Sequence, residues 1–157
     1  MSGDPAATAR QIIERVTYMT LATADENGRP WASPVWFANS PDFDEFFWVS
    51  RHEALHSLNI AARPQVSLVI FDSHAVPGEG QAVYVAASAS MLSEGDDLNA
   101  GIEIFSKRSV AQGIGPWTPE HVAADRAIRL YRAAAVEHWI LDKDNPAPGD
   151  HRMSVRP

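Results

Sequence analysis

The sequence contains no cysteine among its 157 residues. This absence excludes disulfide frameworks, zinc sites built on cysteine, iron–sulfur clusters and thiol nucleophiles. Basic residues are scarce too, because 13 Lys and Arg stand against 20 Asp and Glu, giving a net charge of −7, and they form no run. Nucleic acids and anionic membranes normally require a basic patch, so neither is an expected partner.

Long hydrophobic runs are also missing. No stretch approaches the ~18 apolar residues of a membrane span, and the first part of the chain lacks the continuous apolar block of a secretory signal. We therefore expect a cytoplasmic location. Residues 1–157 have the length of a single domain, and a hydrophobic content of 45% is enough to build its core.

The helical patterns in the chain are short. Residues 1–17 are predicted to hold an N-terminal helix, because Asp4 is a capping residue, Pro5 suits the first turn and apolar residues follow with helical spacing. Pro64 ends a second helical stretch that begins at about His52. Two more are expected from about residue 96 and over residues 118–125.

Six segments have the composition and alternation of β-strands. They cover residues 18–24, 31–38, 45–50, 65–72, 81–92 and 128–141. Asn27 and Gly28, between the first two, favour the positive φ angles of a hairpin turn. Residues 142–157 contain three prolines and no periodic pattern, which predicts a loop or arm. The expected fold is mainly β, a six-stranded antiparallel barrel with flanking helices.

A zinc motif lies at the start of the second helical stretch, where the sequence reads His52-Glu53-Ala54-Leu55-His56. In zinc hydrolases, two histidines at this spacing bind the metal from one face of a helix, and the glutamate activates water. That arrangement needs a long supporting helix and a third ligand, whereas Pro64 ends this helix early. A zinc hydrolase is therefore the third functional hypothesis.

The same segment can instead form an anion site. The N-terminus of a helix offers free backbone N–H groups and a favourable dipole, and a guanidinium, an imidazole and hydroxyls can complete the site. The residues that would supply them are Ser50, Arg51, His56 and Ser57. A simpler alternative is that Ser50 caps the helix and Arg51 is a solvated surface charge.

Several segments, taken in order, resemble a known family. They are Tyr18-Met19-Thr20-Leu21-Ala22-Thr23, Asn27-Gly28-Arg29-Pro30, Ser33-Pro34-Val35-Trp36-Phe37, Trp48-Val49-Ser50, His56-Ser57-Leu58-Asn59-Ile60, Arg63-Pro64-Gln65-Val66-Ser67-Leu68-Val69-Ile70-Phe71-Asp72 and Gly80-Gln81-Ala82-Val83-Tyr84. The set is similar to the pyridoxamine 5′-phosphate oxidase-like, FMN-binding split-barrel family and covers about residues 10–141. The resemblance implies a split barrel, flavin mononucleotide (FMN) as cofactor, and a homodimer with two shared cofactor sites.

The resemblance also implies roles for single residues. Val35 and Trp36 would lie along the flavin ring, and Gln81 would reach the ring from a strand near the dimer interface. The residues that would approach the phosphate are Ser50, Arg51, His56 and Ser57.

The function implied by the resemblance is that of an FMN-binding oxidoreductase, which would use a reduced nicotinamide or a similar donor on an unidentified small molecule. Because the flavin carries the redox chemistry, no catalytic acid or base is singled out. Where the biosynthetic oxidases carry an Arg-Lys pair, this chain has Leu55-His56, a weaker anion clamp. That difference supports the alternative of a module that binds or stores flavin, deazaflavin or haem without turnover. Neither hypothesis assigns a metal-binding residue.

Overall fold

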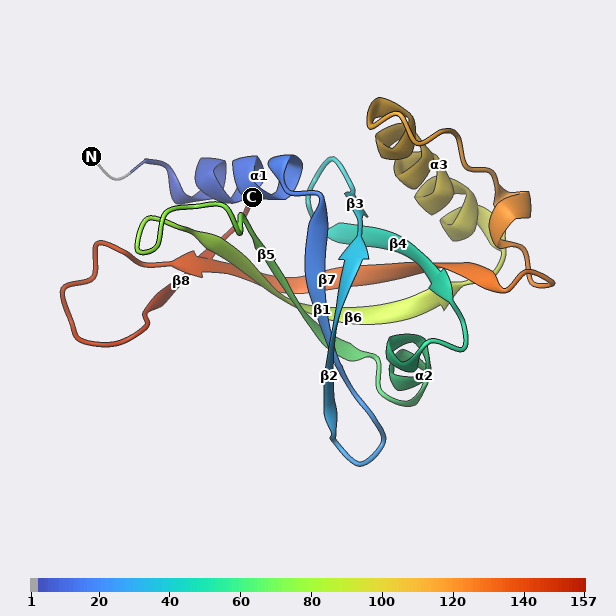
Figure 1. Ribbon diagram of the computed structural model, residues 1–157, viewed down its shortest axis with the longest axis horizontal. Helices are drawn as coiled ribbons and strands as arrows, with labels where there is room; N and C mark the ends of the chain where they lie inside the picture. Colours follow the sequence, from blue (N-terminus) through green and yellow to red (C-terminus); the bar gives the residue numbers. More distant parts are fainter. Residues whose placement is uncertain (1–2) are drawn as a thin grey trace.

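The computed structural model describes residues 3–157, which form a curled antiparallel sheet with helices around it (Figure 1). The strands are β1 (Tyr18–Ala24), β2 (Pro30–Trp36), β3 (Ala38–Asn39), β4 (Glu45–Arg51), β5 (Gln65–Phe71), β6 (Ala82–Leu92), β7 (Ile128–Leu141) and β8 (Arg152–Val155). The helices are α1 (Pro5–Arg15), α2 (Leu55–Ala62), α3 (Gly95–Ala111) and the 3₁₀ helix η1 (Pro119–Val122). Met1 and Ser2, part of the predicted N-terminal segment, lie outside the described residues.

The sheet curls into a split barrel, as predicted. Its strands follow the order β2-β1-β5-β6-β7-β4-β3, every neighbouring pair is antiparallel, and β8 pairs with the second half of β7. β2 and β4 are remote in this order but approach each other across the split (Figure 1). The register between β6 and β7 shifts between Ala86 and Ala87, and this bulge separates the half of β7 that pairs with β4 from the half that pairs with β8.

All six predicted strands are present, together with two short ones that the sequence pattern does not predict. The pattern predicts one strand over residues 31–38, whereas β2 ends at Trp36 and β3 starts at Ala38. The prediction of a loop or arm over residues 142–157 is wrong in part, because β8 forms there. β8 exists through pairing with β7, with Val155 opposite His138, a long-range contact that no local pattern records.

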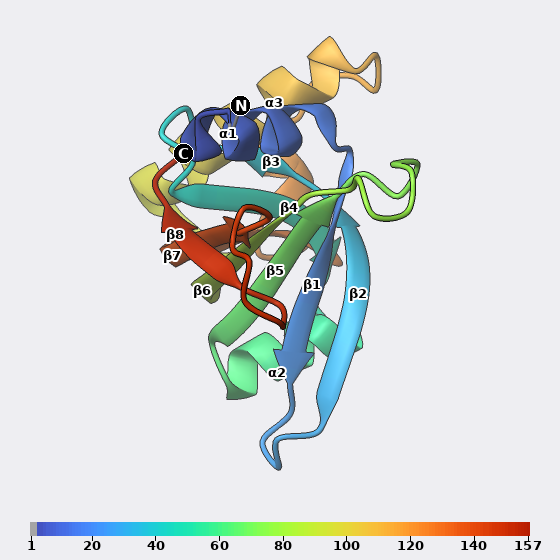
Figure 2. The same cartoon turned by 90° about the vertical axis from the view of Figure 1, so that its left-hand side faces the viewer.

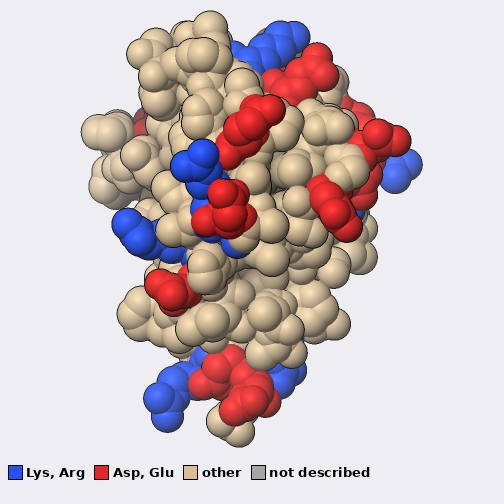
Figure 3. Space-filling view, turned by 90° about the vertical axis from the view of Figure 1, so that its right-hand side faces the viewer, with Lys and Arg blue, Asp and Glu red and all other residues tan. Residues whose placement is uncertain are grey.

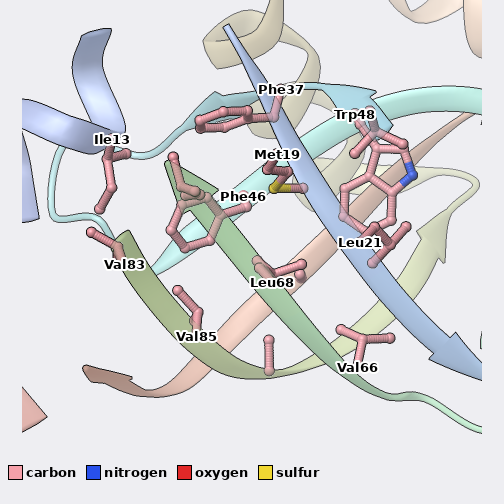
Figure 4. Packing of buried hydrophobic residues seen from close by; sticks show 14 of the residues in the cluster. Ile13, Met19, Leu21, Phe37, Phe46, Trp48, Val66, Leu68, Val83 and Val85 are labelled. Atoms are coloured by element: carbon pink, nitrogen blue, oxygen red, sulfur yellow. The ribbon is translucent and has the colours of Figure 1, made fainter. Parts of the chain in front are cut away.

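Large apolar side chains fill the barrel interior (Figure 4). Those that are fully buried there include Trp48, Phe37, Phe46, Ile13, Met19, Leu21, Leu68, Ile70 and Val83. Ile13 lies on α1 and Phe37 between β2 and β3, whereas the others occupy alternate, inward-facing positions along their strands. The predicted N-terminal helix is confirmed as α1, capped by the carboxylate of Asp4, and its buried Ala9, Ile12 and Ile13 join this core. α2 lies toward the opposite end of the barrel (Figure 1).

α3, the longest helix, covers the outer side of β4 and β7. Its Leu98, Ile102 and Phe105 form a second core with Phe47 and Leu130. No helix within residues 3–157 is long and apolar enough to cross a membrane.

α2 begins at Leu55 rather than at His52, which corrects the predicted start of this helix. The backbone N–H of His52 instead donates to the carbonyl of Ala127 at 3.2 Å. A tight turn follows, in which the N–H of Ala54 donates to the carbonyl of Arg51 at 3.1 Å. The helix predicted over residues 118–125 is likewise only the single turn η1.

Candidate functional site

One histidine joins the two sides of the split. His56 lies in the first turn of α2, and its Nε2 is 2.7 Å from the Oγ of Ser50 near the end of β4. Its Nδ1 is 3.2 Å from the Oγ of Ser33 on β2. We name Ser33, Ser50 and His56 the serine–histidine cluster. It unites two predicted site residues with a third that the sequence analysis missed.

Trp31 determines the direction of the hydrogen bonds in the cluster. Its indole N–H can only donate, and Nε1 lies 3.0 Å from the Oγ of Ser33. The buried Ser33 must then place its own hydroxyl proton, for which the Nδ1 of His56 is the acceptor within reach. This arrangement puts the ring proton of His56 on Nε2, where it is donated to Ser50. The hydroxyl proton of Ser50 is left free for an incoming acceptor.

The first turn of α2 presents backbone donors beside the cluster. Ala54, at the N-cap, gives no side-chain hydrogen bond, and the first backbone bond of the helix joins the N–H of Leu58 to the carbonyl of Ala54. The N–H groups of residues 55–57 therefore have no acceptor within residues 3–157. Such donors at the positive end of a helix dipole suit an anion.

The imidazole in the cluster is held in its neutral form. Burial lowers the pKa of His56 below its ordinary value, because a charged ring loses hydration when it is enclosed. At neutral pH the cluster therefore offers polarised hydrogen-bond donors but no net charge.

Buried polar contacts hold α2 in place. The Oγ of Ser57 donates to the carbonyl of Arg51 at 2.8 Å, and the Nδ2 of Asn59 donates to the Oγ1 of Thr23 at 3.0 Å. Ser57, Asn59 and Thr23 are all buried. Ser57 thus serves the helix start, while Arg51 contributes its backbone here and exposes its side chain. Contact of either residue with a ligand stays a prediction.

The two residues predicted to lie along a flavin ring face opposite sides of β2. Val35 is buried inside the barrel, whereas Trp36 packs outside, edge-on to Phe105 at 4.7 Å. The Nε1 of Trp36 also donates to the Oε1 of Gln112 at 2.7 Å. β2 is a terminal strand in the sheet order, so its backbone edge at the split has no strand partner among residues 3–157.

Gln81 is not part of the serine–histidine cluster. Its amide lies where β6 begins and β7 ends, with Nε2 donating to the carbonyl of Leu141 at 3.0 Å. Its Oε1 accepts from the N–H groups of Leu141, at 2.9 Å, and Ala82, at 3.1 Å. These bonds hold the start of β6 against the end of β7 in the same chain. Contact between Gln81 and a flavin stays a prediction.

The zinc hypothesis is wrong. His52 and Glu53 precede α2, so the two histidines do not share one helical face, and both ring nitrogens of His56 contact serine hydroxyls. No group of three His, Cys, Asp or Glu side chains within residues 3–157 is arranged to hold a metal ion. The alternative role of Ser50 as a helix cap is wrong too, because the helix starts later and Ser50 bonds His56.

Comparisons with known proteins agree with this architecture. Residues 6–140 match the family model described as pyridoxamine 5′-phosphate oxidase. No curated protein sequence matches the chain significantly.

Three solved structures illustrate the likeness of fold. HutZ, a haem storage protein from Vibrio cholerae, is 20% identical with a TM-score of 0.66, and the match covers 85% of this chain and 91% of that one. A haem-binding protein from Mycobacterium smegmatis is 20% identical with a TM-score of 0.72, covering 98% and 59%. An F420 reductase is 20% identical with a TM-score of 0.59, covering 83% and 94%.

Proposed function

The chain belongs to the pyridoxamine 5′-phosphate oxidase family, because the family model matches residues 6–140. From this premise we propose that the protein is a flavoprotein that binds FMN. It would pass electrons from a reduced nicotinamide, or a similar donor, to a small molecule. The substrate is not assigned.

The serine–histidine cluster beside the open first turn of α2 carries this proposal. The phosphate of FMN needs several hydrogen-bond donors in one place. The free hydroxyl proton of Ser50 and the N–H groups of residues 55–57 supply them, and the ring of His56 orients Ser50. Arg51, next to Ser50, adds a positive charge. The donor set therefore fits a phosphate.

The flavin ring is proposed to lie along β2. The free backbone edge of this terminal strand offers N–H and carbonyl groups to the polar edge of the ring. Trp48, fully buried and two residues before Ser50 on β4, stacks on Tyr131 with 5.7 Å between ring centroids. This pair excludes water from the barrel behind the cluster, which strengthens the hydrogen bonds made there.

When bound, FMN would supply the redox chemistry. The residues of this chain would bind the phosphate, orient the ring against β2 and exclude water. No side chain is assigned as a catalytic acid or base.

A homodimer is proposed from a sheet surface whose own strands carry no charged side chain, although the guanidinium of Arg152 on β8 lies 4.4 Å over the ring of Tyr84. The outward side chains of β1, β2, β5 and β6 include no charged residue, although the chain as a whole is 21% charged. They include Tyr18, Thr20, Ala22, Ala24, Ala32, Pro34, Gln65, Ser67, Val69, Phe71, Tyr84, Ala86 and Ser88. Figure 2 shows β1, β2 and β5 with no helix over this face. We name it the open sheet face, and a second copy of the chain is its proposed partner.

The alternative proposal is a module that binds or stores flavin, deazaflavin or haem without turnover. The structural likeness to two haem-binding proteins and to an F420 reductase supports it.

A titration of the purified protein with FMN, followed by visible absorption, tests the proposed function. A red-shifted flavin spectrum that saturates at one FMN per subunit supports it, and turnover with a reduced nicotinamide then separates an oxidoreductase from a storage module. The variant Ser50→Ala should weaken binding about tenfold, since one hydrogen bond to a charged group is lost. The exposed Ser93→Ala is the matched control. An FMN spectrum that never changes, together with tight haem or F420 binding, would favour the alternative.

A further inference from the structure

His56 is the only titratable side chain in the serine–histidine cluster, and its charge is free to change on binding. Its ring contacts two serines and no ion-pair partner. Burial of the ring lowers its pKa. A lysine at this position would stay charged throughout the neutral range, whereas an imidazole would not.

The surroundings of His56 contain few other titratable groups. α2 packs against β1, β2 and β6. β2 has no titratable side chain, β1 has only Tyr18 and β6 only Tyr84, both on the open sheet face. The charged or titratable neighbours along the chain are Arg51, His52 and Glu53, all exposed. On β7 the buried Arg129 lies opposite Ser50, and its guanidinium is hydrogen-bonded to the carbonyls of Ala123 and Ala124. The protonation state of His56 would therefore respond mainly to a bound ligand.

The bond from Trp31 makes protonation of His56 costly in the free protein. With Trp31 donating to its Oγ, Ser33 is satisfied when it donates in turn to the Nδ1 of His56. Once Nδ1 carries a proton, Ser33 must accept two hydrogen bonds and turn its own hydroxyl proton away. Because Ser33 is buried, that proton then lacks a partner.

From this geometry we infer that FMN binding is coupled to the uptake of one proton by His56, and that Ser33 is the positioning residue that keeps His56 neutral until the phosphate arrives. The inference rests on the proposed function and concerns regulation of the same site by pH. A proton from solvent adds to Nδ1, Nε2–H is retained, and no other bond forms or breaks. The imidazolium then faces a phosphate dianion, and their attraction offsets the cost at Ser33.

Calorimetric titration of the protein with FMN tests the coupling, because the heat measured in two buffers of different ionisation enthalpy gives the number of protons taken up. The pH should be kept above ~7, so that the phosphate, whose second pKa is about 6, stays a dianion. We expect uptake approaching one proton per FMN. The dissociation constant should rise about tenfold per pH unit between the two pKa values of His56.

Variants separate the roles of the two residues. His56→Lys and His56→Gln should abolish proton uptake, and the lysine should bind FMN with little dependence on pH across the neutral range. Ser33→Ala should raise the pKa of His56 in the free protein and so reduce uptake. Trp31→Phe, which removes only the indole N–H that donates to Ser33, should likewise raise the pKa of His56 and reduce proton uptake. His74→Gln, at an exposed position, is the control.

Nitrogen NMR of the imidazole gives a readout that does not need the cofactor. In the free protein His56 should be the Nε2–H tautomer, and Ser33→Ala should lose that preference. FMN binding without proton uptake, or uptake that persists in His56→Gln, would overturn the inference and leave the flavoprotein proposal standing. Absence of FMN binding at every pH, with haem or F420 bound instead, would overturn both.

Discussion

Arg108, in the last turn of α3, connects parts of the chain that lie far apart in sequence. Its guanidinium donates to the carbonyl of Val16 at 2.8 Å and to the Oδ1 of Asn39 at 3.0 Å. It also lies 4.8 Å above the ring of Phe37. α1, α3 and β3 are thus tied together through one side chain.

We expect Arg108→Met to destabilise the protein by ~2–3 kcal/mol, because three acceptors lose a charged donor in a half-buried place. Urea unfolding followed by tryptophan fluorescence measures the change. Lys107→Met, at the exposed neighbouring position, should have an effect within ~0.5 kcal/mol. Equal effects of the two substitutions would contradict the role given to Arg108.

Stability should also depend on pH through His138. This residue is 5% exposed, and its Nε2 donates to the carbonyl of Phe43 at 2.9 Å. Burial is the largest cause that lowers its pKa, against the bond to Phe43 and the charge of Asp44. The folded state therefore binds a proton less readily than the unfolded chain.

The free energy of unfolding should accordingly be fully present above about pH 6.5 and fall as the pH drops below that value. We expect a loss of ~1 kcal/mol between pH 7.5 and 5.5, measured by urea unfolding, and a flatter profile for His138→Gln. Asp42, whose pKa is lowered mainly by the hydrogen bond from Ser40, adds a loss only at more acid pH. A profile identical in wild type and variant would rule out His138 as the cause.

At the scale of elements, the close contact between α3 and β4 depends on a residue without a side chain. A Cβ added at Gly101 would lie 2.8 Å from the Cε1 of Phe47. Alanine usually stabilises a helix interior by up to ~1 kcal/mol relative to glycine.

Gly101→Ala should nevertheless destabilise this protein by ~1–3 kcal/mol, since α3 or Phe47 must move. Asn99→Ala, at an exposed position of the same helix, should be neutral or slightly stabilising. Thermal unfolding of both variants makes the comparison. An increase in stability for Gly101→Ala would show that α3 can shift at no cost.

Elements with a strong local pattern could be predicted from the sequence. The Asn27-Gly28 turn and the alternation along β6 both reflect local preferences. The sequence therefore predicts β1, β2 and β6 nearly in full. The start of α2 was missed because the pairing of His52 with Ala127 replaces the first helical turn, and that pairing is long-range.

The candidate site was predicted only in part, for the same reason. Ser50 and His56 were found because they flank a helix start. Ser33 lies within a segment that was recognised, but only the curl of the sheet brings β2 opposite β4. Local alternation places Ser33 on the inward side with Val35 and cannot show what it meets there.

At the scale of the whole molecule, charge is distributed unevenly. Acidic and basic side chains are scattered over the face in Figure 3, whereas the strand residues of the open sheet face carry none. That face exposes 58% of Tyr18 and 46% of Phe71, a pattern typical of a protein interface.

Ser67→Glu should convert the proposed dimer into a monomer. Ser67 lies between Ala22 on β1 and Ala86 on β6, so the change buries a carboxylate of each copy in the interface. Sedimentation velocity at micromolar concentration measures the outcome, and Ser93→Glu is the control. A wild-type monomer, or a dimer that tolerates Ser67→Glu, would place the interface elsewhere or remove it.

The antiparallel pairing of β4 with β7 sets the order in which the barrel can close during synthesis. Glu45 lies opposite Ala134, so β4 cannot pair with β7 until nearly the entire C-terminal half of the chain has been synthesised. β1 and β2 form a local hairpin and can pair early. A nascent chain that ends before β7 exposes the apolar faces of β4 and β6. In this state the chain can bind a chaperone or aggregate.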